Sequence, residues 1–177
     1  MERRTRDLLK VVALKIDDFI FAPAVRGTFF RAVDPNYRTY ALSGSRAAGR
    51  YSRAEQPTLY LSSSLAGVEA AMTAHKNARS AELQTLQMDV AASRIIDLRD
   101  VQALSKIGID LEDAIAPWQD VVARGGIPSS WLVRDRLIDV GANGIIDPSR
   151  TKPGLWHLVL FRWNEHDAPT VRLTHPE

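Results

Sequence analysis

The sequence contains no cysteine, which excludes disulfides, thiolate zinc sites and cysteine nucleophiles. This lack is typical of proteins in a reducing cytoplasm, so we expect a cytoplasmic protein. Long hydrophobic runs are also missing, because Lys15, Asp17 and Asp18 interrupt the apolar stretch near the start of the chain. The sequence therefore predicts neither a secretory segment nor a membrane span.

A large charge of either sign is absent as well. The 23 Lys and Arg residues exceed the 21 Asp and Glu residues by only 2 in a chain of 177 residues. Such a small excess argues against a protein that binds nucleic acid through phosphate contacts, and we expect no direct nucleic-acid partner. Arginines nevertheless gather between Arg3 and Arg53, which allows a local site for an anionic ligand.

Several well-known catalytic and cofactor motifs are missing. No three glycines stand in the Rossmann arrangement, no lysine follows a phosphate-binding glycine loop, and no serine lies between glycines as in a nucleophile elbow. The four histidines lack the short spacing of a zinc site. We therefore predict no metal site, and we assign the histidines to ordinary core or surface roles.

The hydrophobic pattern predicts one α+β domain. Residues 1–27 contain an amphipathic helix over 5–20 and a lead-in, and 28–177 form the rest of the compact domain. Strands are expected over 29–33, 58–62, 83–90, 94–98, 144–147, 156–163 and 170–173. Helices are expected from 63 or 64 to about 77, and over 101–106, 111–123 and 130–140, with Ser129 and Ser130 as caps. Because strands and helices do not alternate regularly, we expect a mixed or mostly antiparallel sheet flanked by helices.

Three side chains in residues 49–69 suggest a site for a ligand. Gly49 allows a sharp turn before Arg50, whose guanidinium suits a phosphate but also suits a surface salt bridge. Tyr60 is expected on the same strand face as Ser62. Glu69 follows among small apolar residues, so it either pairs with an arginine or serves a ligand. An arginine, an aromatic ring and a carboxylate together are suited to cleaving a glycosidic bond in a dinucleotide.

The order of short motifs resembles the RES domain family, which is named after an arginine, a glutamate and a serine. The resemblance extends from about Thr28 to Trp163. The motifs are Phe30-Arg31-Ala32-Val33-Asp34-Pro35, Ser43-Gly44, Gly49-Arg50-Tyr51, Leu59-Tyr60-Leu61-Ser62, Glu69 and Asp147-Pro148-Ser149, followed by an apolar strand from Leu158 to Trp163.

The resemblance implies a fold like that of the ADP-ribosyltransferase toxins and the toxin half of a toxin-antitoxin pair. Such a toxin consumes NAD by cleaving its nicotinamide-ribose bond with phosphate or water, without a metal. Transfer of ADP-ribose to a protein or nucleotide-related target is the alternative activity, and a binding protein without chemistry is the second alternative. The implied partner is an Xre-like helix-turn-helix antitoxin that covers residues 43–53 and blocks the active site. A larger toxin-antitoxin oligomer is a further expectation.

The resemblance also assigns roles to individual residues. Arg31 and Arg50 would hold the phosphates of NAD, and Tyr60 would pack against nicotinamide or its ribose. Glu69 would orient the ribose and stabilise the positive charge that develops on it, while Ser149 would contact the ligand or Glu69. Arg50, Tyr60 and Glu69 are thus the expected catalytic residues.

Tyr51 and Ser62 complete the expected NAD-binding set. The sequence departs from the family pattern at Ser52, where relatives carry an asparagine, and at residues 53–57, where they have a turn rich in proline and glycine. An anion pocket built from Arg46, Arg50 or Arg53 would favour phosphate as the attacking group.

Overall fold

The computed structural model describes residues 20–73 and 83–174. The amphipathic helix predicted over residues 5–20 therefore lies outside the described residues, apart from its last position. The division into residues 1–27 and 28–177 stays a prediction for the same reason.

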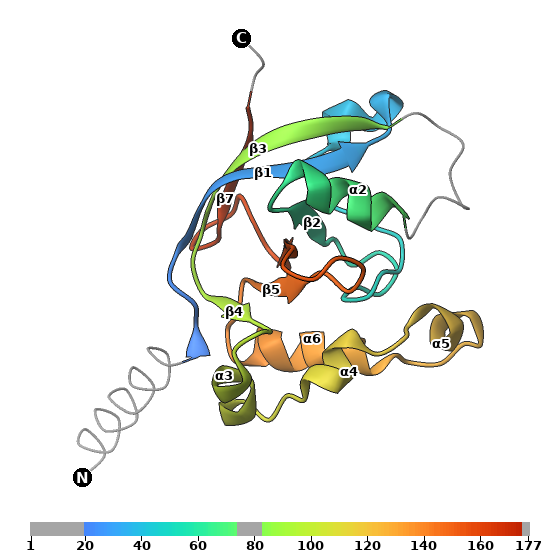
Figure 1. Ribbon diagram of the computed structural model, residues 1–177, viewed down its shortest axis with the longest axis vertical. Coiled ribbons are helices and arrows are strands. Elements are labelled where there is room, and N and C mark those ends of the chain that lie inside the picture. The colour runs from blue at the N-terminus through green and yellow to red at the C-terminus, as the bar shows by residue number, and fades with distance from the viewer. Residues whose placement is uncertain (1–19, 74–82, 175–177) are drawn as a thin grey trace.

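The core of the described chain is one seven-stranded sheet (Figure 1). Its strands are β1 (Val25–Val33), β2 (Leu59–Ser62), β3 (Gln84–Ala92), β4 (Ile95–Asp97), β5 (Gly144–Pro148), β6 (Trp156–Leu160) and β7 (Thr170–Leu173). They lie side by side in the order β4-β5-β6-β2-β1-β3-β7. Among them β4 and β5 are the one parallel pair, and the others are antiparallel. The predicted α+β class with a mostly antiparallel sheet is confirmed.

The helices predicted over 101–106 and 130–140 are confirmed, and the helix predicted from 63 or 64 is confirmed as far as Thr73, since its expected end near 77 lies outside the described residues. No helix was predicted over Pro35–Tyr40. The structure has a 3₁₀ helix η1 (Pro35–Tyr40) and the α-helices α2 (Leu65–Thr73), α3 (Val101–Lys106), α4 (Leu111–Ile115), α5 (Gln119–Ala123) and α6 (Ser129–Asp139). The single helix predicted over 111–123 is wrong, because it is divided at Ala116, whose ψ of 151° is extended. Pro117 causes the break, since proline disfavours the helical conformation of the residue before it.

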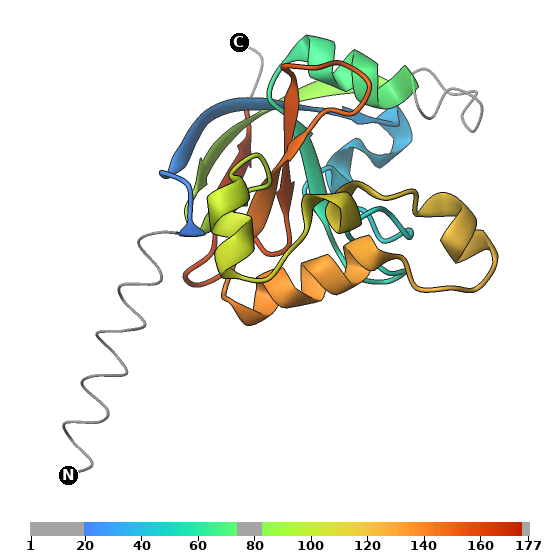
Figure 2. The same cartoon turned by 60° about the horizontal axis from the view of Figure 1, so that its bottom comes forward.

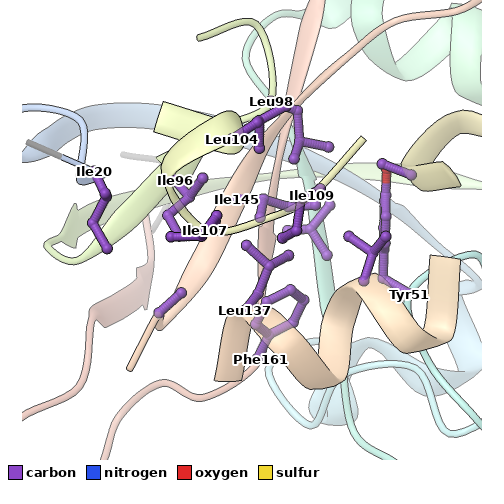
Figure 3. Close-up of a cluster of buried hydrophobic side chains, with 14 residues drawn as sticks. Ile20, Tyr51, Ile96, Leu98, Leu104, Ile107, Ile109, Leu137, Ile145 and Phe161 are labelled. Carbon is purple, nitrogen blue, oxygen red and sulfur yellow. The ribbon is translucent and has the colours of Figure 1, made fainter. Parts of the chain in front are cut away.

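Two hydrophobic clusters occupy the two faces of the sheet. The first joins β4, β5 and β6 to α3, α4 and α6, and Figure 3 shows it with Tyr51 at its edge beside α6. The second joins side chains of β1, β3 and β7 to those of β2, β4, β5 and β6, so the sheet curls around it. Alternation along β2 separates the two: Leu59 and Leu61 enter the second cluster, while Tyr60 packs against the first.

The face that carries Tyr60 also meets helix α2. Phe30 of β1 pairs directly with Ser62 of β2, and a Cβ atom at Gly67 of α2 would lie 3.2 Å from Ser62 Cβ. Helix α2 therefore packs over the end of β2, whereas α4 and α6 pack further along the same face. Figure 2 shows α2 towards the top and α6 towards the bottom of the view, so the two helices cover different parts of this face.

Candidate active site

Arg50 and Tyr51 form the tip of a tight turn. The N–H of Gly49 donates to the carbonyl oxygen of Ser52 at 2.9 Å, and the N–H of Ser52 donates back to Gly49 at 3.3 Å. Helix α6 holds this turn from outside, because Trp131 Nε1 donates to the Gly49 carbonyl at 2.8 Å. The position of Arg50 is thus set by the start of α6.

The serines at the start of α6 do not cap it. Ser130 Oγ donates to the Arg50 carbonyl at 2.6 Å, and Ser129 Oγ donates to the Asp113 carbonyl at 2.8 Å. No side chain caps the helix, whose N-cap position is Pro128. The predicted caps are therefore wrong, and Ser130 instead helps to fix the turn that presents Arg50.

Gly49 is required because other groups approach it closely. A Cβ atom at this position would lie 2.8 Å from Tyr60 Oη and 2.9 Å from Ser52 Oγ. Its φ is not in the left-handed region, so the sharp turn by itself does not require a glycine. The lack of a side chain at Gly49 leaves room for the Tyr60 hydroxyl.

The Tyr60 hydroxyl sits within a small polar network. It accepts a hydrogen bond from the Tyr51 N–H at 3.2 Å and shares another with Ser52 Oγ at 3.2 Å. Burial raises the pKa of Tyr60, while these hydrogen bonds and the positive charge of Arg134 act in the opposite direction. Ser52, although it departs from the family pattern, is thus fully buried and engaged with Tyr60.

Arg134 is the charged group behind this network. It lies on α6, is 3% exposed, and its guanidinium stacks over the Phe161 ring at 5.0 Å. Burial lowers the pKa of Arg134. Its Nε and Nη1 atoms are buried and have no hydrogen-bond partner among the described residues. Its charge therefore acts on Tyr60 through space rather than through a bond.

Asp147 connects the turn to the end of β5. The Tyr51 hydroxyl donates to Asp147 Oδ1 at 3.0 Å, and Arg150 Nη2 donates to Asp147 Oδ2 at 3.3 Å. Burial, and after it the negative charge of Asp147, raises the pKa of Tyr51 well above its ordinary value. Tyr51 is therefore a neutral hydrogen-bond donor that anchors the turn to a buried carboxylate.

A polar row crosses three strands next to this carboxylate. Ser62 of β2 pairs with His157 of β6, which pairs with Asp147 of β5. Ser62 Oγ lies 3.1 Å from His157 Nδ1. Burial is the main cause that lowers the pKa of His157; the charge of Arg150 lowers it further, and that of Asp147 raises it. Ser62, His157 and Asp147 thus form a continuous polar strip on the face that carries Tyr60.

Arg50 reaches from the tip of the turn to the segment between α4 and α5, where its Nη1 donates to the Ala116 carbonyl. No other acceptor for its guanidinium is recorded among residues 20–73 and 83–174. Burial lowers the pKa of Arg50, and the positive charge of nearby Arg150 lowers it further. The positive charges of the two arginines therefore act unfavourably on each other.

Glu69 occupies a different environment from the one its sequence neighbours suggest. Gly67, Val68 and Ala70 of α2 are buried, but Glu69 is exposed. Its carboxylate has no hydrogen bond or ion pair within the described part of the chain. No arginine in residues 20–73 or 83–174 pairs with it, and because the carboxylate is exposed it keeps its hydration. Glu69 remains accessible to a ligand.

Two other expected binding residues, Arg31 and Ser149, make hydrogen bonds within loops. Arg31 takes the sheet face opposite to Tyr60 and Ser62, since its neighbour Phe30 pairs with Ser62, and its Nη1 donates to the Ala41 carbonyl. Ser149 begins the loop after β5, where its Oγ accepts from the Lys152 N–H at 3.3 Å. Both residues organise loops in the structure, and their roles toward NAD stay predictions.

The turn over residues 53–57 is held by an ion pair. Arg53 makes two bonds, of 2.8 and 2.7 Å, to the carboxylate of Asp135 on α6. This interaction raises the pKa of Arg53 and lowers that of Asp135. Arg46 lies 3.8 Å from Glu55 on the surface. The guanidinium of Arg53 is therefore paired with Asp135 of α6, and that of Arg46 lies beside the carboxylate of Glu55.

Sequence reasoning missed Asp147, Arg150 and His157 as members of the site. One signal was available for Asp147, because a carboxylate that follows Gly144, Ile145 and Ile146 in a buried strand requires partners. Arg150, three residues later, is one of them. His157 carried no such signal, since its contacts depend on the pairing of β6 with β2.

The described residues contain no group of three or more His, Cys, Asp or Glu side chains that could hold a metal ion. Nor does this part of the chain include a helix that is long and apolar enough to cross a membrane.

One family model and one solved structure resemble this chain. A family model described as RES domain matches residues 28–177. A solved structure, the M. tuberculosis MbcT-MbcA toxin-antitoxin complex, contains a chain similar to this one. The TM-score is 0.62 with 19% sequence identity, and the match covers 92% of this chain and 89% of that chain. No curated protein matches the chain significantly. At this identity the structural likeness establishes a shared fold.

Gly49→Ala is expected to displace the Tyr60 hydroxyl and to lower the free energy of unfolding by about 1–3 kcal/mol, the usual cost of overpacking. Chemical denaturation of the four members of a double-mutant cycle with Tyr60→Phe measures this effect. Because the nearest atom is the Tyr60 hydroxyl, Gly49→Ala should cost less in the Tyr60→Phe background. Equal costs in both backgrounds would refute the steric account.

The lowered pKa of His157 predicts a pH-dependent contribution to stability. As pH falls through the ordinary histidine value near 6.5, the unfolded chain binds a proton before the folded chain does, so folding is weakened. The contribution is complete above this range and declines below it. We expect the free energy of unfolding of His157→Gln to fall less than that of the wild type between pH 8 and pH 5.

His166→Gln is the control for this experiment, since the His166 side chain is 94% exposed. Its stability should follow the wild-type pH profile. A His157→Gln profile parallel to that of the wild type would show that burial of this imidazole has no effect on proton binding.

Proposed function

The chain belongs to the RES domain family, and from this premise we propose that it is the toxin of a toxin-antitoxin pair and cleaves the nicotinamide-ribose bond of NAD. One structural observation supports the proposal most strongly. The Gly49–Ser52 turn brings a guanidinium with few partners, Arg50, next to an aromatic hydroxyl, Tyr60, whose surroundings are buried and polar. Such a cluster is costly to fold and is typical of a functional site.

Cleavage of the nicotinamide-ribose bond requires little general acid or base catalysis. Nicotinamide in NAD carries a positive charge, so it leaves as a neutral molecule once the electrons of the C–N bond move to its nitrogen. The enzyme must hold the diphosphate, stabilise the positive charge that develops on the ribose, and direct the attacking group to its C1 atom. A hydrogen-bonding aromatic ring, a cation and an accessible carboxylate meet these needs.

We assign one part of this task to each residue. Arg50 holds a phosphate of NAD, and in doing so exchanges the Ala116 carbonyl for phosphate oxygens. Tyr60 packs against nicotinamide or its ribose. Glu69, which has no competing partner in the described chain, orients the ribose and stabilises its positive charge. Tyr51 and Ser62 support the binding face through Asp147 and His157.

Arg31 and Ser149 act less directly in this proposal. Arg31 fixes the loop before the Gly49–Ser52 turn through the Ala41 carbonyl. Ser149 stabilises the loop that carries Arg150. Their substitution should therefore disturb the binding of NAD through the positions of these loops.

The attacking group determines the product. Phosphate forms a bond from its oxygen to the ribose C1 atom and gives ADP-ribose 1-phosphate. Water gives ADP-ribose, with its proton released to the solvent, and a nucleophile of another molecule gives transferred ADP-ribose. Phosphate is the attacking group that an arginine-rich site favours.

Nicotinamide release from NAD by the purified chain tests the proposed activity. We expect release by the wild type, and a loss of about 100-fold or more in Glu69→Gln, the size usual for removal of a charge-stabilising group. Glu165→Gln is the control, because Glu165 is an exposed carboxylate in the turn after β6. Its rate should equal that of the wild type.

Two results would count against this account. No release from the wild type, with or without phosphate, would exclude the enzymatic function. An undiminished rate in Glu69→Gln would exclude the role given to Glu69 but not the enzymatic function. Labelled ADP-ribose attached to a protein would instead identify a transferase.

The proposed partner is a small helix-turn-helix protein of the Xre type that blocks entry to the site. The solved relative is a toxin-antitoxin complex, which supports the existence of such a partner. Residues 43–53 carry Arg50 at the tip of their turn, so a protein that covers them would also cover the entrance for NAD.

Amide hydrogen exchange of this chain, alone and in complex with the proposed helix-turn-helix antitoxin, tests this contact. We expect slower exchange at residues 43–53 in the complex, because the partner excludes water from them, together with loss of nicotinamide release. A complex in which these amides exchange as fast as in the isolated chain would contradict the proposed mode of inhibition.

A further inference from the structure

Arg150 lies beside the candidate active site without a role in the function proposed so far. It follows β5 on an exposed loop, and its side chain is 36% exposed. The 3.3 Å bond from its Nη2 to Asp147 is the one hydrogen bond of this guanidinium recorded for the described residues. A guanidinium has five donors, so most of those of Arg150 remain available to a ligand.

Asp147 fixes where this arginine lies. The carboxylate is 4% exposed, and its other oxygen accepts the hydroxyl of Tyr51, which is fully buried. Because Tyr51 follows Arg50 in the chain, one buried carboxylate positions both arginines relative to each other. A buried carboxylate that holds a guanidinium from one side leaves the opposite edge of that guanidinium free to bind.

The two arginines concentrate positive charge at this place. Tyr51, which follows Arg50 in the chain, and Arg150 bind the two oxygens of the same Asp147 carboxylate, so the turn that carries Arg50 and the loop that carries Arg150 meet there. In agreement with this geometry, the charge of Arg150 contributes to lowering the pKa of Arg50, after the larger effect of burial. Two guanidinium groups and one carboxylate leave a local charge of +1 (2 − 1). His157, the other titratable group that faces Arg150 and Asp147 from β6, is buried with a lowered pKa and adds no positive charge while it is neutral.

Other arginines are less suited to the same task. Arg53 is engaged by both oxygens of Asp135, and Arg46 lies beside Glu55 on the surface. The anion pocket expected from Arg46, Arg50 or Arg53 is therefore better formed by Arg50 with Arg150, 100 positions later in the chain.

We propose that Arg50 and Arg150 form a two-arginine site for a phosphate group, with Asp147 as the residue that positions Arg150. The group is either inorganic phosphate that attacks the ribose or the diphosphate of NAD. The assignment of the phosphate group to one of these two sources rests on the proposed function, whereas the binding of a phosphate group does not. Two guanidinium groups bind a doubly charged tetrahedral anion far better than one, since each donates charge-assisted hydrogen bonds.

Arg150→Gln tests the proposal, and Arg162→Gln is its matched control. Both arginines are exposed to a similar degree, 36% and 44%, and each pairs with a carboxylate three residues away. Arg162 lies in the turn after β6, and the account gives it no part in binding. Arg150→Lys retains the charge but loses the planar fork, so it should have an intermediate effect.

The first measurement is binding without turnover, by titration calorimetry with inorganic phosphate and, separately, with ADP as a diphosphate probe. We expect Arg150→Gln to weaken the binding of at least one of the two probes by about tenfold or more, the value of one charge-assisted hydrogen bond. Arg162→Gln should bind both probes as the wild type does. Unchanged binding of both probes by Arg150→Gln, or equal weakening in Arg162→Gln, would overturn the proposal.

Nicotinamide release then distinguishes the sources of the phosphate group. A higher KM for phosphate alone assigns the site to the attacking phosphate, and a higher KM for NAD alone assigns it to the diphosphate. If the wild type releases no nicotinamide, the proposed function fails, but the calorimetric result still decides whether Arg50 and Arg150 form an anion site. Thermal unfolding of each variant checks that Arg150→Gln remains folded.

Discussion

The carboxylate of Asp147, buried at the end of β5, holds the candidate site together. One oxygen accepts the Tyr51 hydroxyl and the other accepts Arg150. A buried carboxylate without partners is unstable, so these two contacts are necessary for the fold as well as for the site. Through Tyr51 the carboxylate also anchors the turn that presents Arg50, and through the sheet it adjoins His157 and Ser62.

Helix α6 provides the second support for the same turn. Trp131 and Ser130 bind the carbonyl groups of Gly49 and Arg50, while Arg53 pairs with Asp135 one turn later on the helix. The turn is therefore clamped between a helix and a strand. Such support from two sides keeps a binding loop in one geometry before the ligand arrives, which reduces the cost of binding.

The local parts of the site could be predicted from the sequence. Alternation in residues 58–62 correctly assigned Tyr60 and Ser62 to one face and Leu59 and Leu61 to the other. Local reasoning did not indicate that Glu69 is exposed, because small neighbours on a helix do not determine which side of it is buried. It also could not find that Arg150 and Tyr51 meet at the carboxylate of Asp147, since this meeting depends on the antiparallel pairing of β2, β6 and β5. Pro117 marks the helix break in the sequence. We nevertheless predicted one helix over 111–123, because apolar residues recur at helical spacing on both sides of this proline.

A crystal structure of the inactive Glu69→Gln chain with NAD and phosphate tests the account most directly. The account predicts that nicotinamide or its ribose packs against Tyr60 and that a phosphate group lies between the guanidinium groups of Arg50 and Arg150, with the Asp147 contacts retained. NAD bound away from this face, with Arg50 still on the Ala116 carbonyl and Arg150 without a phosphate contact, would contradict it.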